Sequence, residues 1–324
     1  MKKKWLGLTL AVGVSMIVTA CGSDDSSSGE KEEAFEVGIS QYVEHPSLDE
    51  ATKGFKKAIE DAGLEVKFDE QNAQGDATNN QTIATNFAGD GVDLIFANAT
   101  PSALSAANAT KDIPVVFTSV TDPVGAELVK DFEKPDKNVT GTTDSHPDAI
   151  PNTVKLMADM GYKKIGTVYN SGEQNSEVQV KQAEEEAKKN GLTLQKVSVA
   201  TSAEVKQAAE SLAGKVDAIF IVTDNTVVSA LESVTSVAEA EKIPLFVGEL
   251  DSVERGGFAA YGFSYYDIGY QAGEQAVEIL KDDKEVKDIP VEVPGDLKLV
   301  INKSAAEKMG VDVESIKEEA EYIE

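Results

Sequence analysis

The chain has 324 residues, a length that suits one large domain or two medium ones. It carries 57 acidic and 30 basic residues, a formal net charge of −27, and loss of the N-terminal stretch with three lysines would bring it to about −30. Such a surface repels nucleic-acid phosphates and is not attracted to an anionic membrane, which excludes both as partners. Apolar residues at 41% and charged residues at 27% indicate a folded core and not a disordered chain.

The N-terminal stretch resembles the leader of a bacterial lipoprotein. Lys2 to Lys4 form a positive segment, residues 6–18 form an apolar run, and Val18-Thr-Ala-Cys21 closes it like a lipobox. The resemblance implies that residues 1–20 are a signal peptide and that Cys21 is lipidated. The alternatives are an ordinary signal peptide with a stray thiol and a transmembrane helix, for which the apolar run is short. Residues 21–34 are expected to be a flexible tether, which would place the protein on the extracytoplasmic face of the cell membrane.

From residue 35 on, short β-branched runs alternate with helical periodicity. The first half predicts strands at 35–43, 64–68, 93–97 and 113–119, with helices at 48–62 and 78–87 and another from residue 100. Ser47 and Glu50 match a capping box, and Thr100 is expected to cap the helix that begins with Pro101. This alternation predicts a mostly parallel sheet covered by helices on both faces.

The pattern begins again after residue 144. It predicts strands at 164–169, 194–199, 217–222 and 244–248, and helices at 176–190, 203–213 and 226–241. Segments 93–117 and 217–247 are alike in detail, which favours two similar α/β lobes. Segment 138–144 is expected to cross between the lobes, and a helix at 266–280 with a strand at 288–293 to cross back. The predicted lobes are 35–142 plus 266–290, and 143–265 plus 291–324.

Residues suited to catalysis are scarce. The histidines are His45 and His146, and the sequence offers no nucleophile paired with a base, so no enzyme is predicted. The run Asp144-Ser-His-Pro-Asp148 has metal-ligand types, but solvated polar residues are the favoured reading in an extended crossover, and neither a metal nor a cofactor is expected. His45 is expected to be a hydrogen-bonded turn residue, and Arg255 a surface residue.

Polar residues at the carboxyl ends of the predicted strands are the candidate binding site, because ligands of open α/β sheets bind there. The candidates are Gln41, Tyr42, Thr100, Thr118, Ser119, Tyr169, Asn170, Asp224, Asn225 and Glu249. Hydroxyl groups and helix N–H groups suit a carboxylate, and Asp224 and Glu249 suit an ammonium group, so the solute is expected to be a zwitterion. The open alternatives are that Thr100, Ser119 and Asp224 only cap helices and that the tyrosines only flank the cleft.

Several motifs together resemble a family of ABC-transporter substrate-binding lipoproteins, some of which bind tryptophan or phenylalanine. They are the runs His45-Pro-Ser-Leu-Asp49, Thr121-Asp-Pro123, Tyr169-Asn170, Thr223-Asp-Asn225, Gly248-Glu249 and Tyr265-Tyr-Asp-Ile-Gly269. The resemblance covers residues 35–315. It implies the type I periplasmic-binding fold, with two doubly wound Rossmann-like lobes joined by a three-strand hinge that closes on a ligand. No motif identifies the side-chain pocket.

The predicted function is capture of a small solute, an aromatic or other apolar amino acid, between two lobes for import by an ABC permease. The expected partners are this solute, the permease subunits and the membrane through the lipid alone, and the chain is expected to be a monomer. The alternative is a surface lipoprotein that senses a ligand, or adheres, and reports to a partner.

Overall fold

The computed structural model describes residues 34–316 and 319–324. The predicted signal peptide, Cys21 and the tether up to residue 33 lie outside this part of the chain. None of the helices that the structure describes combines the length and the apolar character that crossing a bilayer requires.

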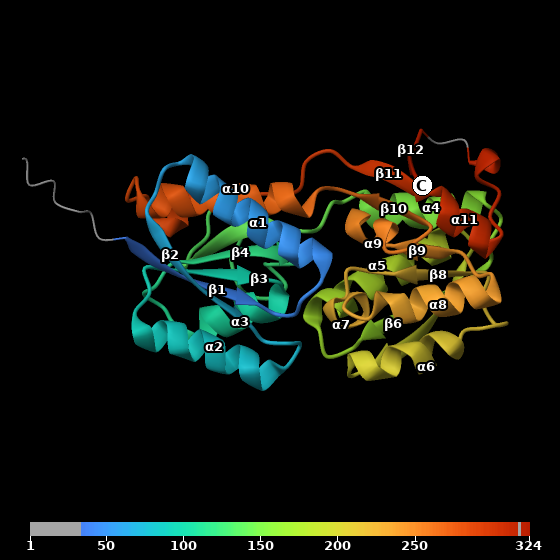
Figure 1. The fold of residues 1–324 in the computed structure, drawn as a ribbon, viewed down its shortest axis with the longest axis horizontal. Helices are drawn as coiled ribbons and strands as arrows, with labels where there is room; N and C mark the ends of the chain where they lie inside the picture. Colours follow the sequence, from blue (N-terminus) through green and yellow to red (C-terminus); the bar gives the residue numbers. More distant parts are fainter. Residues whose placement is uncertain (1–33, 317–318) are drawn as a thin grey trace, which may run out of the picture. The chain divides into compact units, whose positions relative to one another are not determined.

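The described chain contains two sheets (Figure 1). The sheet of the first lobe has five parallel strands in the order β2-β1-β3-β4-β5. They are β1 (Phe35–Gln41), β2 (Val66–Asn72), β3 (Leu94–Asn98), β4 (Val115–Val120) and β5 (Val139–Thr143). The last three are buried along their whole length, as expected for strands covered on both faces.

The second lobe is built on a seven-stranded sheet in the order β12-β11-β10-β9-β8-β6-β7. The strands are β6 (Lys164–Asn170), β7 (Thr193–Val199), β8 (Ala218–Ile221), β9 (Leu245–Val247), β10 (Ala259–Gly262), β11 (Lys298–Asn302) and β12 (Glu321–Ile323). Neighbouring strands are parallel, apart from the antiparallel pair β10 and β11.

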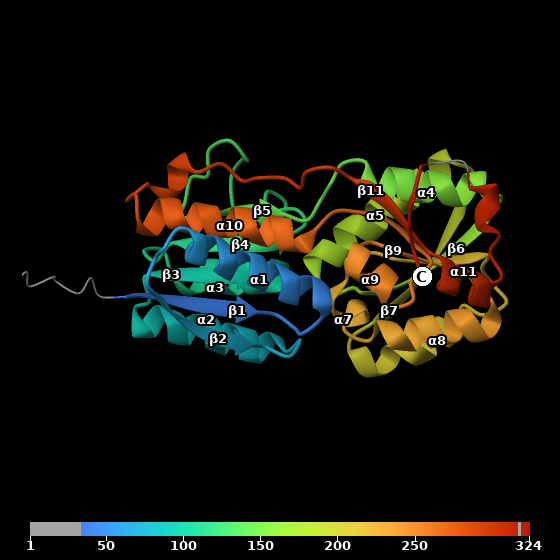
Figure 2. The same cartoon turned by 45° about the horizontal axis from the view of Figure 1, so that its top comes forward.

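Helices lie on both faces of each sheet (Figures 1 and 2). In the first lobe α1 packs against α10 and α2 packs against α3; in the second, α4 contacts α5, and α6 and α11 contact α8. The helices are α1 (Pro46–Asp61), α2 (Ala77–Asp90), α3 (Thr100–Ala109), α4 (Ala149–Asp159), α5 (Gln174–Lys189), α6 (Val205–Glu210), α7 (Asn225–Val228), α8 (Leu231–Glu241), α9 (Leu250–Glu254), α10 (Tyr265–Leu280) and α11 (Lys303–Met309), with 3-10 turns at Ser202–Glu204, Val286–Asp288 and Val313–Ser315.

Three segments of the described chain connect the lobes. They lie between β5 and α4, between β10 and α10, and between the turn at Val286–Asp288 and β11. The helix α10 therefore belongs to the first lobe although it follows most of the second in sequence, and it packs on α1, β4 and β5.

Glycines allow α1 and α10 to approach closely. A Cβ atom on Gly269 of α10 would lie 1.9 Å from the carbonyl oxygen of Ala51, and one on Gly54 of α1 would lie 2.1 Å from the carbonyl oxygen of Tyr266. Real Cβ atoms do not come that near a backbone oxygen. The two helix backbones are therefore in direct contact, and only glycine fits at these positions.

Two predicted helix starts are wrong. Helix α1 begins at Pro46 with His45 at its N-cap, so Ser47 and Glu50 do not form a capping box. Proline at the first helical position lets the helix begin earlier in the chain than predicted, because its fixed φ already suits a helix. Helix α3 begins at Thr100 itself, after Ala99.

Other differences concern the later part of the chain. The strand predicted at 288–293 is wrong: a 3-10 turn at Val286–Asp288 is followed by extended chain with a single bridge from Glu292 to Thr142. Pro290 and Pro294 lack the N–H groups that a central strand needs. The helix predicted at 226–241 is interrupted between α7 and α8, and α4, α9, α11 and β10 to β12 were not predicted. The segment 138–144, predicted only as a crossover, contains β5, the edge strand of the first sheet.

Candidate functional site

Loops that follow strands of both sheets enclose a small cavity, called here the polar cavity. Its volume is about 10 Å³, the space of one water molecule. It is lined by His45, Leu48, Ser119, Asp144, Asn175, Thr223, Asn225, Val228, Glu249 and Tyr265. Three of the predicted site residues, Ser119, Asn225 and Glu249, are thus brought together across the two lobes.

The polar cavity contains buried atoms that have no hydrogen-bond partner in the structure. They are Nδ1 of His45, Oγ of Ser119 and Oδ1 of Asn175. The large majority of buried side-chain polar atoms in folded proteins are paired, because an unpaired one loses its hydration without compensation. Their gathering in one cavity indicates a site that binds a polar ligand.

Two turns of the first lobe next to this cavity have strained backbone. Ala99 (φ 92°) and Ser119 (φ 57°) lie at the ends of the paired strands β3 and β4, in conformations that disfavour side chains. The hydroxyl group of Thr100, the first residue of α3, is also buried and without a partner. These turns place two unpaired hydroxyl groups beside the N-terminus of a ten-residue helix, an arrangement that suits an anion.

Two carboxylates face the polar cavity, Asp144 from the first connecting segment and Glu249 from the end of β9. Asp144 accepts hydrogen bonds from Thr121 Oγ1 (2.8 Å) and from the Tyr265 hydroxyl (2.9 Å). Glu249 Oε1 accepts one from Ser252 Oγ (2.7 Å). Burial raises the pKa of both groups. Within the described residues neither acid forms an ion pair, although the more distant Arg255 charge partly lowers the raised pKa of Glu249.

Asp224, at the N-cap of α7, has both carboxylate oxygens occupied. Oδ1 accepts a hydrogen bond from Val227 N (2.8 Å) and Oδ2 accepts one from Asn170 N (2.5 Å). Burial, and then the charge of Glu173, raises its pKa to about 7. In this arrangement Asp224 caps α7 and ties it to the end of β6.

Glu173 is a buried acid that the sequence analysis did not select. Its carboxylate accepts hydrogen bonds from Asn225 Nδ2 (2.6 Å), Thr226 Oγ1 (2.7 Å) and Thr226 N (3.1 Å). It lies three residues beyond the end of β6, at the N-cap of α5. An acid after Gly172, just ahead of a helix, was the signal that could have identified it.

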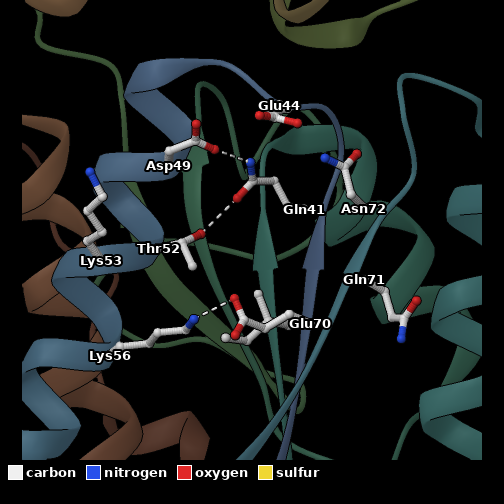
Figure 3. Close-up of a pocket in the computed structure, with 10 residues that line it drawn as sticks. Gln41, Glu44, Asp49, Thr52, Lys53, Lys56, Glu70, Gln71 and Asn72 are labelled. Atoms are coloured by element: carbon white, nitrogen blue, oxygen red, sulfur yellow. Dashed lines mark hydrogen bonds and ion pairs between the residues drawn. The ribbon is translucent and has the colours of Figure 1, made fainter.

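Gln41 turns toward a different cavity, the larger one shown in Figure 3. That cavity, about 290 Å³, lies between α1 and the strands β1 and β2. Gln41 donates to Asp49 (2.7 Å) and accepts from Thr52 (2.9 Å), while Lys56 pairs with Glu70. The side chains that line it bond to one another, which makes it a weaker candidate for a binding site.

The remaining predicted residues do not line the polar cavity. The Tyr42 hydroxyl donates to the Gly75 carbonyl (3.0 Å), and burial with the nearby charges of the second lobe raises its pKa to about 12. Thr118 bonds to Thr142 (2.8 Å). Asn170 Nδ2 donates a hydrogen bond to Thr226 (2.9 Å). Burial, and then the charge of the neighbouring Glu177, raises the pKa of the Tyr169 phenol.

The structure also places three other polar residues that the sequence singled out, His45, Arg255 and His146. His45 is buried against the cavity, and burial and then the Arg255 charge lower its pKa to about 4, so it is neutral at pH 7. Arg255 is only 15% exposed: it binds Glu232 through two nitrogens and donates to the Val228 carbonyl. Around His146, as elsewhere in the described residues, no metal-binding group of three or more side chains occurs.

A third cavity, about 20 Å³, adjoins the polar one and shares Asp144 and Thr223 with it. Apolar and aromatic side chains form much of its wall. They are Ala149, Ile150, Phe220, Tyr261 and Phe263. A carboxylate thus lies between a polar and a partly aromatic space.

The sequence matches the ABC transporter substrate binding protein family over residues 36–322. The chain belongs to this family. It is 45% identical over 315 residues to a tyrosine-binding protein of Clostridioides difficile (strain R20291), a match that covers 93% of this chain and 90% of that one. As members of this family bind solutes, the chain is a substrate-binding protein and not an enzyme.

Two solved structures extend the comparison of this substrate-binding protein. A domain from Streptococcus pneumonia in complex with L-Trp is 35% identical, with a TM-score of 0.84 over 90% of this chain and all of that one. A ligand-free, open structure from Clostridium difficile, of a substrate binding protein with adhesive properties, is 42% identical but has a TM-score of 0.66, over 90% of this chain and 99% of that one. The predicted type I periplasmic-binding fold is confirmed, and the structure is more similar to the complex despite the lower identity.

Proposed function

We propose that this protein captures an aromatic amino acid between its two lobes and delivers it to an ABC permease. The observation that carries the proposal is the polar cavity, where unpaired buried polar atoms from both lobes meet two buried carboxylates that form no ion pair within the described residues. The tyrosine-binding relative and the complex with L-Trp support the choice of an aromatic side chain.

Each part of an amino acid has a matching group in this proposal. The ammonium group pairs with Glu249 and Asp144, whose buried charges need a cation. The carboxylate binds the hydroxyl groups of Ser119 and Thr100 at the start of α3. The side chain enters the cavity beyond Asp144, against Phe220 and its aromatic neighbours. Asp224, which does not line the polar cavity and accepts hydrogen bonds from the backbone N–H groups of Asn170 and Val227, holds α7 in place instead.

The lobes are proposed to move as a hinge, with limits at 35–142 plus 266–290 and at 143–265 plus 291–324. The polar cavity has room for about one water molecule, so the solute must enter a more open arrangement. Ligands stabilise closure when they contact both lobes, because their affinity for the closed form is then higher. The higher TM-score with the L-Trp complex than with the open structure supports such a movement.

Calorimetric titration of the purified protein with L-tyrosine, L-tryptophan and L-phenylalanine tests the function. We expect at least one to bind with a Kd of about 1 μM or tighter, and small-angle scattering to show a smaller radius of gyration with that ligand. L-Leucine serves as the apolar control. Failure of all three aromatic amino acids to bind would refute the assignment.

Binding is expected to tighten as the pH rises from 5 to 7.5. The ammonium group pairs with ionised carboxylates, and burial raises the pKa of Glu249, and that of neighbouring Asp251 to about 6. Below its pKa, each carboxyl that must lose its proton weakens binding by up to about tenfold per pH unit. His45 stays neutral over this range. Titrations at several pH values, in two buffers that reveal proton release, would show an affinity independent of pH if these acids do not hold the amine.

Buried acids at and beside the site set the pH dependence of the protein without solute. Burial raises the pKa of Glu249 and Asp144 in the folded state, and that of Asp251 to about 6. Their contribution to stability is therefore complete below the unfolded pKa values near 4 and is lost as the pH rises through the folded pKa values. A bound amine reverses this loss, so the solute should raise the melting temperature more at pH 7.5 than at pH 5.

The proposed site of action is the extracytoplasmic face of the membrane, through a lipid on Cys21. Cys21→Ser is expected to leave the fold and solute affinity unchanged and to release the protein from the membrane fraction, because the lipid is the proposed anchor. Fractionation of cells followed by immunoblotting measures this. A serine variant that stays with the membrane in high salt would show another means of attachment.

A second candidate function is adhesion or sensing at the cell surface. The adhesive properties stated for the Clostridium difficile protein with the open structure support this second candidate. Genes for a permease and an ATPase beside this gene would favour transport, and their absence would favour the surface role.

A further inference from the structure

Glu173 lies behind the polar cavity and holds the side-chain nitrogens of two asparagines that line it. Its Oε2 accepts a hydrogen bond from Asn225 Nδ2 (2.6 Å) and a longer one from Asn175 Nδ2 (3.4 Å). Asn175 Nδ2 donates in addition to the carbonyl oxygen of Thr223 (3.1 Å). Both amide nitrogens are therefore committed to acceptors of the second lobe.

Glu173 is itself held firmly. Only 3% of its surface is exposed, and its Oε1 accepts hydrogen bonds from the backbone N (3.1 Å) and the hydroxyl group (2.7 Å) of Thr226. A carboxylate that is fixed in this way accepts hydrogen bonds and donates none. It therefore determines which end of each neighbouring amide turns toward it.

The opposite ends of these amides are oxygens. Asn175 Oδ1 is buried and without a partner in a residue that lines the polar cavity. Asn225 lines the same cavity, and its side chain hydrogen-bonds to His45. With the carboxylates of Asp144 and Glu249, the cavity then offers acceptors on several sides. Such a lining suits a group that donates several hydrogen bonds at once.

We propose that Glu173 is a positioning residue that turns the Asn175 oxygen into the polar cavity, holds Asn225 against His45, and so makes the cavity selective for a primary ammonium group. The inference rests on the proposed function and deepens it. An analogue that lacks the amine would leave buried acceptors unpaired, and sites of this kind reject such analogues strongly.

The test compares L-tyrosine with 3-(4-hydroxyphenyl)propionate, which has the same ring and carboxylate but no amine. In calorimetric titrations the wild type should prefer L-tyrosine by roughly a thousandfold. Glu173→Gln keeps the shape of the side chain but adds a donor, so the amides can reverse. The preference should then fall at least about tenfold, mainly through weaker binding of L-tyrosine. A general loss of structure would weaken both ligands alike and leave the ratio unchanged.

Two further variants complete the test. Glu177→Gln makes the same change one turn along α5 at an exposed position, and its preference should match that of the wild type. Asn175→Ala removes a proposed acceptor and leaves Glu173 bound to Asn225 and Thr226, so it provides the same readout if Glu173→Gln does not fold. A wild-type ratio in either Glu173→Gln or Asn175→Ala overturns the role of Glu173. Failure of the wild type to bind aromatic amino acids overturns the proposed function and this inference with it.

Discussion

Glu249→Gln is expected to weaken the binding of an aromatic amino acid by about 3 kcal/mol, roughly a hundredfold in Kd. The glutamate is buried at the end of β9, lines the polar cavity and forms no ion pair within the described residues. An ammonium group that enters the cavity would lose a charge-assisted partner in this variant. The amide keeps the size of the side chain and can still accept the hydrogen bond of Ser252.

The stability of the unliganded protein separates this effect from damage to the fold. A buried charge without a partner is unfavourable, so Glu249→Gln should melt at the same temperature as the wild type or higher. Glu254→Gln, an exposed change on α9, the short helix that has Glu249 at its N-cap, should alter neither affinity nor melting. Asp224→Ala is expected instead to lower the melting temperature of the unliganded protein, because the backbone N–H groups of Asn170 and Val227 would lose their acceptors. Unchanged affinity in Glu249→Gln would remove it from the amine site.

Gly269→Ala is expected to destabilise the protein by about 3 kcal/mol or more and to lower its melting temperature by about 10 °C. Its new methyl group would lie 1.9 Å from the carbonyl oxygen of Ala51, so α1 and α10 would have to separate. Backbone cannot move aside as a flexible side chain can. Urea unfolding followed by circular dichroism measures the change.

Gly89→Ala is the matched control for this prediction. Gly89 lies in α2, where an added Cβ meets no atom within 4 Å. Alanine at this helical position should stabilise the protein by up to about 1 kcal/mol, because it reduces the freedom of the unfolded chain. Equal destabilisation by both substitutions would contradict close contact between α1 and α10.

The sequence predicted the strands with long apolar runs well and the short ones poorly. The strand predicted at 164–169 corresponds to β6 and that at 93–97 to β3, because buried parallel strands are read as continuous apolar segments. Strands β10 and β12 have four and three residues, too few to show a period. Both pair with β11, which is antiparallel to β10 and parallel to β12 and follows β10 after a long excursion of the chain.

For the candidate site, the rule that ligands bind at strand ends selected Ser119, Asn225 and Glu249, which meet at the polar cavity. It cannot tell which way a side chain turns. Gln41 also ends a strand, yet it turns to Asp49 and Thr52. Asn175 was missed because it lies inside the first turn of α5 and reaches the cavity only through tertiary packing.

The order of the chain through the two lobes has a consequence for how the protein is made. The sheet of the first lobe ends at β5 (Val139–Thr143), but α10 (Tyr265–Leu280), which covers it, is synthesised more than a hundred residues later. The second sheet receives β11 (Lys298–Asn302) and β12 (Glu321–Ile323) later still. Neither lobe is therefore complete on a nascent chain until most of the polypeptide has left the ribosome. Folding is accordingly delayed to the end of synthesis, and cutting the chain at a single point cannot yield either lobe intact.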